Sequence, residues 1–291
     1  MNRHKADLAL GLNTLIWGAT FTIVKTALRD ISPVLFLALR FSLATVALGG
    51  LWLASWRKAR GEPQGVTGGV LAGTFLFAGF LLQTLGLQFT SPPKSAFLTG
   101  LASVMVPMLA ALVYQNRPQA LEVLGVLVAT AGLGLMTLQG PIGSMEKGDV
   151  LTLFCAAAFA GHIVILGHYS EKTGFEVLSV TQVATAALLA VGLSGWVKPS
   201  RAEWRPAVIY AILVTGLLAT ALTFTVQAWA QRYTTSTRTA LIYTLEPVFA
   251  WLISFWFLGT GLAVRAAAGA ALILGGVVLV EMKPLRNRVH P

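Results

Sequence analysis

The apolar stretch 240–259 holds a carboxylate beside a helix-breaking residue, Glu246 beside Pro247. If this stretch crosses a lipid bilayer as a helix, Glu246 must face the protein interior or a wet cavity, because a lipid-facing charge at that depth is costly. Pro247 lacks an amide N–H, which removes one helical hydrogen bond and favours a kink. The two residues predict either a proton or cation site at a bent helix, or a buried acid that pairs with Arg40 or Lys25 and serves architecture or gating.

Arg40 lies well inside another apolar segment, residues 33–54, too deep to be a simple anchor at a helix end. Its long side chain can still reach towards an interface. A structural ion pair or a cap on backbone carbonyls is favoured over contact with a substrate. Lys25, near the end of the first apolar segment, either reaches the interface or attracts a substrate carboxylate.

Other polar and aromatic side chains are spaced so that they share one face of an apolar helix, as residues three or four apart do. Trp17, His162 and Tyr243 would shape a cavity, while Asn13 and Thr99 would hydrogen-bond a polar headgroup. The alternatives stay open: tryptophan often anchors helices at interfaces, hydroxyls often join helices, and a histidine can be a satisfied core residue. The candidate cavity residues are Asn13, Trp17, Thr20, Thr99, His162 and Tyr243.

The composition indicates that these residues lie in membrane-spanning helices. The chain has 291 residues, of which 56% are hydrophobic and 11% charged, with a mean hydropathy of +0.74. A soluble domain carries about 25% charged residues. Apolar runs of about 20 residues, the length that crosses a bilayer as a helix, recur throughout. The fold class is therefore predicted as an all-α membrane protein with ten transmembrane helices. They are 7–28, 33–54, 66–88, 94–114, 119–138, 149–169, 175–197, 206–230, 236–258 and 262–281.

Enzymatic, cofactor and nucleic-acid functions have no support in the sequence. No HExxH, GxSxG, Walker or CxxC pattern is present, so we expect no catalysis and no bound metal or cofactor. The single cysteine, Cys155, excludes an intramolecular disulfide. The net charge of +10 comes from Lys and Arg at the ends of apolar segments, which is ordinary for membrane proteins and predicts no nucleic-acid partner.

The two halves of the chain repeat one another. "KADL" at 5–8 returns as "KGDV" at 147–150, and "KSAFLTGL" at 94–101 returns as "RTALIYTL" at 238–245. Ordered matches at a nearly constant shift indicate a duplication. Each half holds five segments, an odd number, so the second half must enter the membrane inverted. The predicted units are residues 1–142 and 143–291.

Further matches at the same shift fall inside the apolar segments. Matched glycines are expected where helices pack closely. Inverted repeats are a common construction of secondary transporters, whose binding site lies near the bilayer midplane where the halves meet. The matches are Thr20 with His162, Phe80 with Phe224, Gln83 with Gln227, Thr90 with Thr234, Thr99 with Tyr243, Gly125 with Gly269, and Gly132 with Gly276.

Both termini are predicted to lie in the cytoplasm. The connections that this orientation places there hold more Lys and Arg than those on the opposite side. The first apolar segment is too long for a signal peptide and shows no convincing cleavage site, so we expect it to remain as a membrane span.

Three motifs resemble the EamA-type branch of the drug/metabolite transporter superfamily. They are "LIWGATF" at 15–21, "ALRFSLA" at 38–44, and "LEPVFAWL" at 245–252 followed by "FLG" at 257–259. The resemblance extends over the whole chain and implies a ten-helix transporter, with bacterial aromatic-amino-acid exporters as the nearest likeness. Because "EP" is common to members with different substrates, the resemblance favours an architectural or gating role for it. Members often carry a glutamate where this chain has Thr260.

The function expected is that of a secondary transporter that exports small metabolites, above all amino acids including aromatic ones, across a bacterial inner membrane by alternating access. Export of drugs, nucleosides or polyamines is the alternative, and a channel or an intramembrane enzyme is less favoured. The expected partners are a small-molecule substrate and membrane lipid, with the chain acting as a monomer or homodimer.

Overall fold

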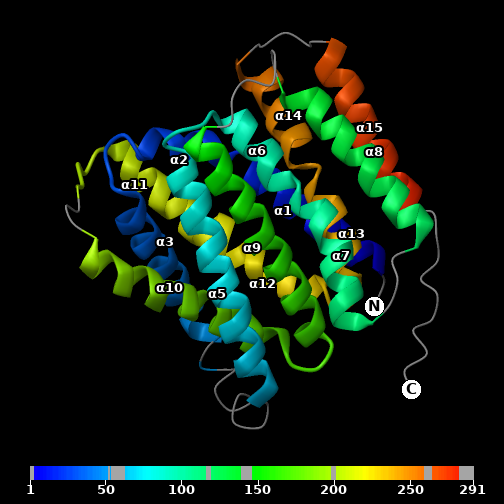
Figure 1. Ribbon diagram of the computed structural model, residues 1–291. Helices are drawn as coiled ribbons and strands as arrows, with labels where there is room; N and C mark the ends of the chain where they lie inside the picture. The colour runs from blue at the N-terminus through cyan, green and yellow to red at the C-terminus, as the bar shows by residue number, and fades with distance from the viewer. Residues whose placement is uncertain are drawn as a thin grey trace.

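The computed structural model describes residues 3–51, 53, 63–115, 119–138, 146–197, 201–258 and 264–281, and this part of the chain is almost entirely helical (Figure 1). Seven helical stretches in it are long and apolar enough to cross a membrane, and two shorter apolar helices accompany them. The all-α membrane class is confirmed.

Each of the ten predicted segments contains helix, and the segments are of two kinds. Single helices are α3 (Pro33–Ala47), α5 (Pro63–Gly86), α8 (Ala120–Thr137), α9 (Lys147–Ser170), α10 (Phe175–Trp196) and α15 (Val264–Glu281). Broken segments are α1 (Arg3–Gly18) with α2 (Thr20–Ala27), α6 (Pro92–Gly100) with α7 (Ala102–Tyr114), α11 (Pro206–Leu213) with η1 (Val214–Leu222) and α12 (Thr223–Ala230), and α13 (Ser236–Tyr243) with α14 (Glu246–Leu258).

The kink predicted at Pro247 is present as the break between α13 and α14. The N–H of Thr244 bonds to the carbonyl of Leu241 at 3.1 Å, and that of Leu245 to the carbonyl of Ile242 at 3.0 Å. These bonds to the third preceding residue tighten the end of α13. Pro247 then stands in the first turn of α14, where a missing N–H costs nothing because that turn has no helical acceptor.

The matching position of the first half is also broken, although no proline stands there. The helix ends at Leu101, whose N–H bonds to the carbonyl of Leu98 at 3.2 Å, and α7 begins directly after it. Both broken helices begin with a capping hydroxyl: Ser91 accepts from the backbone of α6, and Thr235 from that of α13. The two halves therefore share a short helix that stops partway along its membrane-spanning segment.

Helices of one half pack mainly against helices of the other: α5 against α9, α3 against α10, and α8 against α15 (Figure 1). Glycines form the contact between α8 and α15, as predicted. A Cβ on Gly132 would lie 2.6 Å from the carbonyl oxygen of Gly269, and one on Gly125 would lie 2.8 Å from that of Gly276. Backbone meets backbone at both points, so no larger residue fits without movement.

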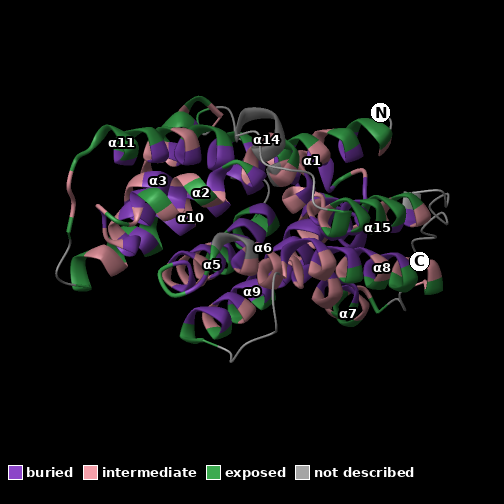
Figure 2. Ribbon diagram, turned by 90° about the horizontal axis from the view of Figure 1, so that it is seen from above, coloured by how far each residue is buried: buried purple, intermediate pink, exposed green. Residues whose placement is uncertain are grey.

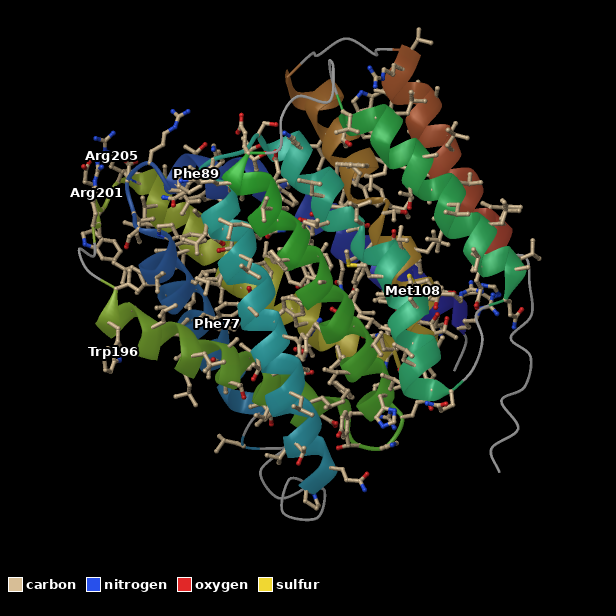
Figure 3. The ribbon with its side chains drawn as sticks, in the orientation of Figure 1. Phe77, Phe89, Met108, Trp196, Arg201 and Arg205 are labelled. Carbon is tan, nitrogen blue, oxygen red and sulfur yellow. The ribbon has the colours of Figure 1, made fainter. Side chains whose placement is uncertain are left out.

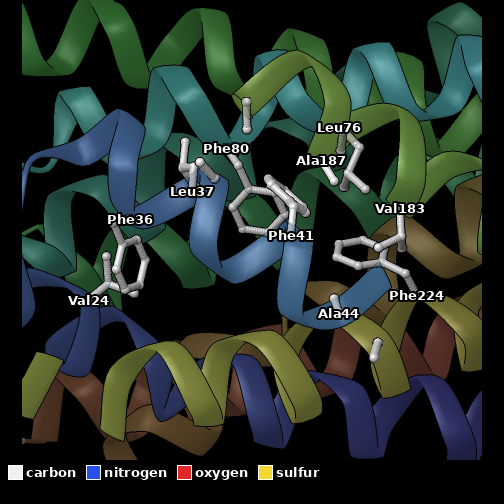
Figure 4. Close-up of a cluster of buried hydrophobic side chains, with 14 of the residues drawn as sticks. Val24, Phe36, Leu37, Phe41, Ala44, Leu76, Phe80, Val183, Ala187 and Phe224 are labelled. Carbon is white, nitrogen blue, oxygen red and sulfur yellow. The ribbon is translucent and has the colours of Figure 1, made fainter. Parts of the chain in front are cut away.

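The largest apolar cluster lies where α3, α5, α10 and α12 meet, with Phe41, Phe80 and Phe224 near its centre (Figure 4). Seen from above, buried positions face inward and exposed positions face outward (Figure 2). Many outward side chains are themselves apolar, such as Met108 and Trp196 in Figure 3, which are 66% and 89% exposed. An apolar exterior over an apolar core is expected of a helical bundle that faces lipid.

Successive spans alternate in direction, so the connections alternate between two ends of the molecule. The start of α1 and the α12–α13 connection share one end, which we name the Asp7 end. The start of α9 and the α5–α6 connection share the other, the Asp149 end. Which end faces the cytoplasm stays a prediction, and the predicted boundary between residues 142 and 143 lies outside the described residues.

The segment 201–205 closes over the α2–α3 connection at the Asp149 end. The N–H of Ser32 bonds to the carbonyl of Arg201 at 2.9 Å, and that of Glu203 to the carbonyl of Asp30 at 2.7 Å. Outside the membrane-spanning helices, the guanidinium of Arg201, followed by that of Arg205, holds the pKa of the Glu203 carboxyl below its usual value (Figure 3).

Candidate functional site

A cavity lies among α1, α2, α3, α5, α6 and α7 of the first half and α9, α12, α13 and α14 of the second. Its empty volume, counted with its opening, is about 880 Å³. The lining residues that bear on its chemistry are Trp17, Thr20, Arg40, Phe80, Gln83, Thr99, Phe159, His162, Phe224, Gln227, Tyr243 and Glu246.

Five of the six side chains expected at a cavity therefore line this one, namely Trp17, Thr20, Thr99, His162 and Tyr243. Asn13 does not. It is buried, and its side-chain amide donates to the backbone carbonyl of Thr223 at 2.8 Å. This bond holds α1 against α12, so Asn13 positions the helices around the cavity.

Aromatic rings form one wall of the cavity. The Trp17 ring centroid lies 4.8 Å from that of Tyr243 and 5.5 Å from that of Phe224. Phe80 and Phe224 meet edge to face, with centroids 5.9 Å apart. The indole N–H of Trp17 donates to the carbonyl of Ala219 at 3.0 Å, which fixes the ring orientation. This wall suits an apolar or aromatic substrate group.

His162 fits both of the interpretations left open by the sequence. Its Nε2 lies 2.8 Å from Oε1 of Gln182, and the amide nitrogen of Gln182 donates to the carbonyl of Phe224 at 3.3 Å. The imidazole is thus a hydrogen-bonded core group that also lines the cavity. It connects α9, α10 and α12 at the cavity wall.

Arg40 caps the π-helix η1, in line with the carbonyl-cap interpretation. Its Nε donates to Thr220 Oγ1 at 2.8 Å and its Nη2 to the carbonyl of Ala219 at 3.2 Å. The guanidinium also lies over the Phe80 ring, 4.1 Å from its centroid. A hydrogen-bond partner for the remaining nitrogen, Nη1, is absent from the described part of the chain. Arg40 also lines the cavity.

Glu246 lines the cavity as the first residue of α14, a position where the helix dipole favours a negative group. Within the described ranges it forms no ion pair with Arg40 or Lys25, the two partners expected from the sequence. Arg40 is engaged at η1, and the Lys25 ammonium donates to the carbonyls of Leu87 and Thr90 at the end of α5. Glu246 is half-buried and lines the cavity.

Sequence reasoning missed two glutamines, Gln83 and Gln227. The amide of Gln83 donates to the Thr99 hydroxyl at 3.2 Å, and the amide of Gln227 donates to Oε1 of Gln231 at 3.0 Å. Gln227 Oε1 is buried and has no partner in the described part. Both glutamines line the cavity. The sequence held a signal for them, because they match each other in the repeat.

Both halves of the chain match one family of known transporters. The model of the EamA-like transporter family matches twice, at residues 4–138 and 146–282, once for each half. An uncharacterized transporter of Archaeoglobus fulgidus is 34% identical over 97% of this chain and 88% of its own length. A probable terminal-alkyne amino-acid exporter of Streptantibioticus cattleyicolor is 26% identical, over 99% of this chain and 97% of its own.

A solved crystal structure superposes with a TM-score of 0.75 over 96% of this chain and 98% of the other. Its sequence is 19% identical, so it bears on the fold alone. The double family match and the match to the archaeal relative each cover almost the whole chain. The chain belongs to the EamA-like transporter family of the drug/metabolite transporter superfamily, whose members carry two repeats in ten helices.

Proposed function

We propose that this transporter exports small amphipathic amino acids, including aromatic ones, across a bacterial inner membrane by alternating access. The observation that carries the proposal is the charge arrangement of the cavity. Arg40 and Glu246 line the same space, and no ion pair joins them.

A zwitterion complements this arrangement. Arg40 Nη1 would donate to the substrate carboxylate, and the Glu246 carboxylate would accept from its ammonium group. Charges that are removed from water are costly unless they are paired, and charge-assisted hydrogen bonds are among the strong ones. One bound amino acid would pair both groups at once. The rings of Trp17, Phe224 and Tyr243 would then take its side chain.

The test uses purified protein in liposomes with labelled phenylalanine and two analogues of the same shape. Phenylalaninamide keeps the ammonium group and loses the carboxylate charge, whereas 3-phenylpropionate keeps the carboxylate and loses the ammonium group. Loss of one charge-assisted bond, about 1.5–3 kcal/mol, predicts uptake of either analogue at least about tenfold slower than that of phenylalanine. Equal uptake of all three would contradict zwitterion recognition.

A carrier is distinguished from a channel by counterflow. Unlabelled phenylalanine inside the liposomes should accelerate uptake of the labelled compound without added ATP. The reason is that a carrier loaded with internal solute returns its binding site to the outside, where it can bind labelled solute again. A channel would show no acceleration. Strict dependence on nucleotide would exclude a secondary transporter.

A second candidate, export of organic cations such as polyamines or cationic drugs, is favoured by Glu246, which has no cationic partner in the described part. It predicts that spermidine is transported faster than phenylalanine and that Arg40→Gln leaves spermidine uptake unchanged. Nucleosides belong in the same panel, since uptake of them alone would assign the cavity to another solute class.

A further inference from the structure

Two sets of polar residues occupy matching positions of the repeat at opposite ends of the molecule. Each set joins an acid at the start of one half to a base and a threonine from the other half. The acids stand at the "KADL" and "KGDV" motifs and the bases at the starts of α6 and α13. We name the sets the Asp149 latch, which is Asp149, Thr90 and Lys94, and the Asp7 latch, which is Asp7, Thr234 and Arg238.

The Asp149 latch is fully hydrogen-bonded. The Lys94 ammonium lies 2.5 Å from Asp149 Oδ2, and the Thr90 hydroxyl donates to Oδ1 at 2.8 Å. The backbone N–H of Glu146 donates to Oδ2 at 2.9 Å. The Asp149 side chain is only 1% exposed. Both carboxylate oxygens are therefore satisfied, and the start of α9 is tied to the α5–α6 connection.

The Asp7 latch lacks the corresponding threonine bond. Arg238 Nη2 donates to Asp7 Oδ2 at 3.2 Å, and Arg238 Nη1 donates to the carbonyl of Val280 at 3.1 Å. Arg3 Nε lies 3.6 Å from the same Asp7 oxygen. Asp7 Oδ1 and Thr234 Oγ1 are both buried, and within the described ranges neither has a hydrogen-bond partner. A buried polar atom without a partner is unfavourable, so this latch keeps its ion pairs but is incompletely hydrogen-bonded.

We propose that the two latches close alternately, each locking its own end of the transporter. In this structure the Asp149 latch is complete, whereas the Asp7 latch keeps its ion pairs and lacks its threonine bond. Each latch joins the two halves, so relative motion of the halves at one end must break its latch. When the Thr90–Asp149 bond breaks and the Thr234–Asp7 bond forms, the Asp149 end can open and the Asp7 end is locked. The proposal rests on the alternating access proposed above and adds the residues that govern it.

The experiment measures from which side the cavity can be reached. The reporter is Ser103→Cys in a Cys155→Ser background, since Ser103 lines the cavity and its hydroxyl donates to the carbonyl of Gly100 in its own segment. A charged, membrane-impermeant thiosulfonate is added to right-side-out and to inside-out vesicles. The two labelling rates report the population open at each end, and no substrate is needed.

Matched variants decide the outcome, whichever end faces the cytoplasm. Thr90→Val removes a bond present in this state and should raise labelling from the Asp149 end at least about fivefold, since about 1 kcal/mol corresponds to that factor. Thr90→Ser keeps the hydroxyl and should keep the parental rates. Thr234→Val removes a hydroxyl that makes no bond here and should not raise labelling from the Asp149 end.

Equal labelling patterns for Thr90→Val and Thr234→Val, in proteins that keep the parental melting temperature, would overturn the proposal and leave the two ion pairs as static supports. Asp149→Asn and Asp7→Asn extend the test, and they should shift labelling towards opposite ends. A directional shift without amino-acid transport would retain the latches and refute the substrate. Transport without a shift would do the reverse.

Discussion

At the scale of single residues, the arrangement of charges departs from the ion pair expected for an acid within an apolar helix. Glu246 has neither Arg40 nor Lys25 as a partner in the described part, because both basic side chains cap backbone carbonyls. Removing one partner of a buried ion pair costs about 3–5 kcal/mol. Since Glu246 has no such partner, that penalty should not arise when its charge is removed.

Glu246→Gln should therefore fold with a melting temperature in detergent close to that of the wild type, while zwitterion transport falls about tenfold or more through loss of a charge-assisted contact. Thermal unfolding and liposome uptake provide the two measurements. A fall in melting temperature that Arg40→Gln partly restores would instead demonstrate an ion pair between the two residues.

At the scale of elements, the breaks in the helices show where sequence signals are sufficient. Pro247 predicted the break between α13 and α14. The matching break at Leu101 has no proline, because Ser103 occupies the corresponding place. Only the repeat relates this break to the one at Pro247. The π-helix η1 had no local signal. There, the Thr220 hydroxyl donates to the carbonyl of Thr215 at 2.7 Å, and Arg40 caps the turn from another helix, which a local pattern cannot reveal.

Pro247→Ala restores an N–H that can bond to the carbonyl of Tyr243 and so join α13 to α14. A continuous helix should resist the exchange between states more than it alters the cavity, because the side chain of Pro247 does not line it. Counterflow should become slower while the half-saturating solute concentration changes little. A large change in that concentration with unchanged flux would contradict the gating role of the break.

At the scale of the whole molecule, composition and repeat predicted the ten segments, their inversion and the glycine contacts. These depend on patterns that extend over many residues. What the sequence could not provide is which side chains meet across the halves: Asn13 was expected in the cavity and instead joins α1 to α12. Such contacts depend on helix rotations that no periodicity determines.

The glycine contacts offer a matched pair within one helix. Gly269→Ala should destabilise the protein by about 1–3 kcal/mol through overpacking, because its Cβ would lie 2.6 Å from the carbonyl oxygen of Gly132. Gly275→Ala should be neutral or stabilising, since nothing lies within 4 Å of its Cβ and alanine favours helix. Melting temperatures in detergent test this, and equal effects would show that the contact does not limit stability.

The contacts between α8 and α15 are reciprocal. Gly125 meets Gly276, and Gly132 meets Gly269, so each glycine contacts the copy of its neighbour in the repeat. That is the pattern of an isologous dimer, here formed by two parts of one polypeptide. Recognition between the halves is thus built into these two helices. Two five-helix chains, 1–138 and 146–291, expressed separately in one membrane should associate and co-purify, and their assembly should be weakened when Gly132 and Gly269 are both replaced by leucine.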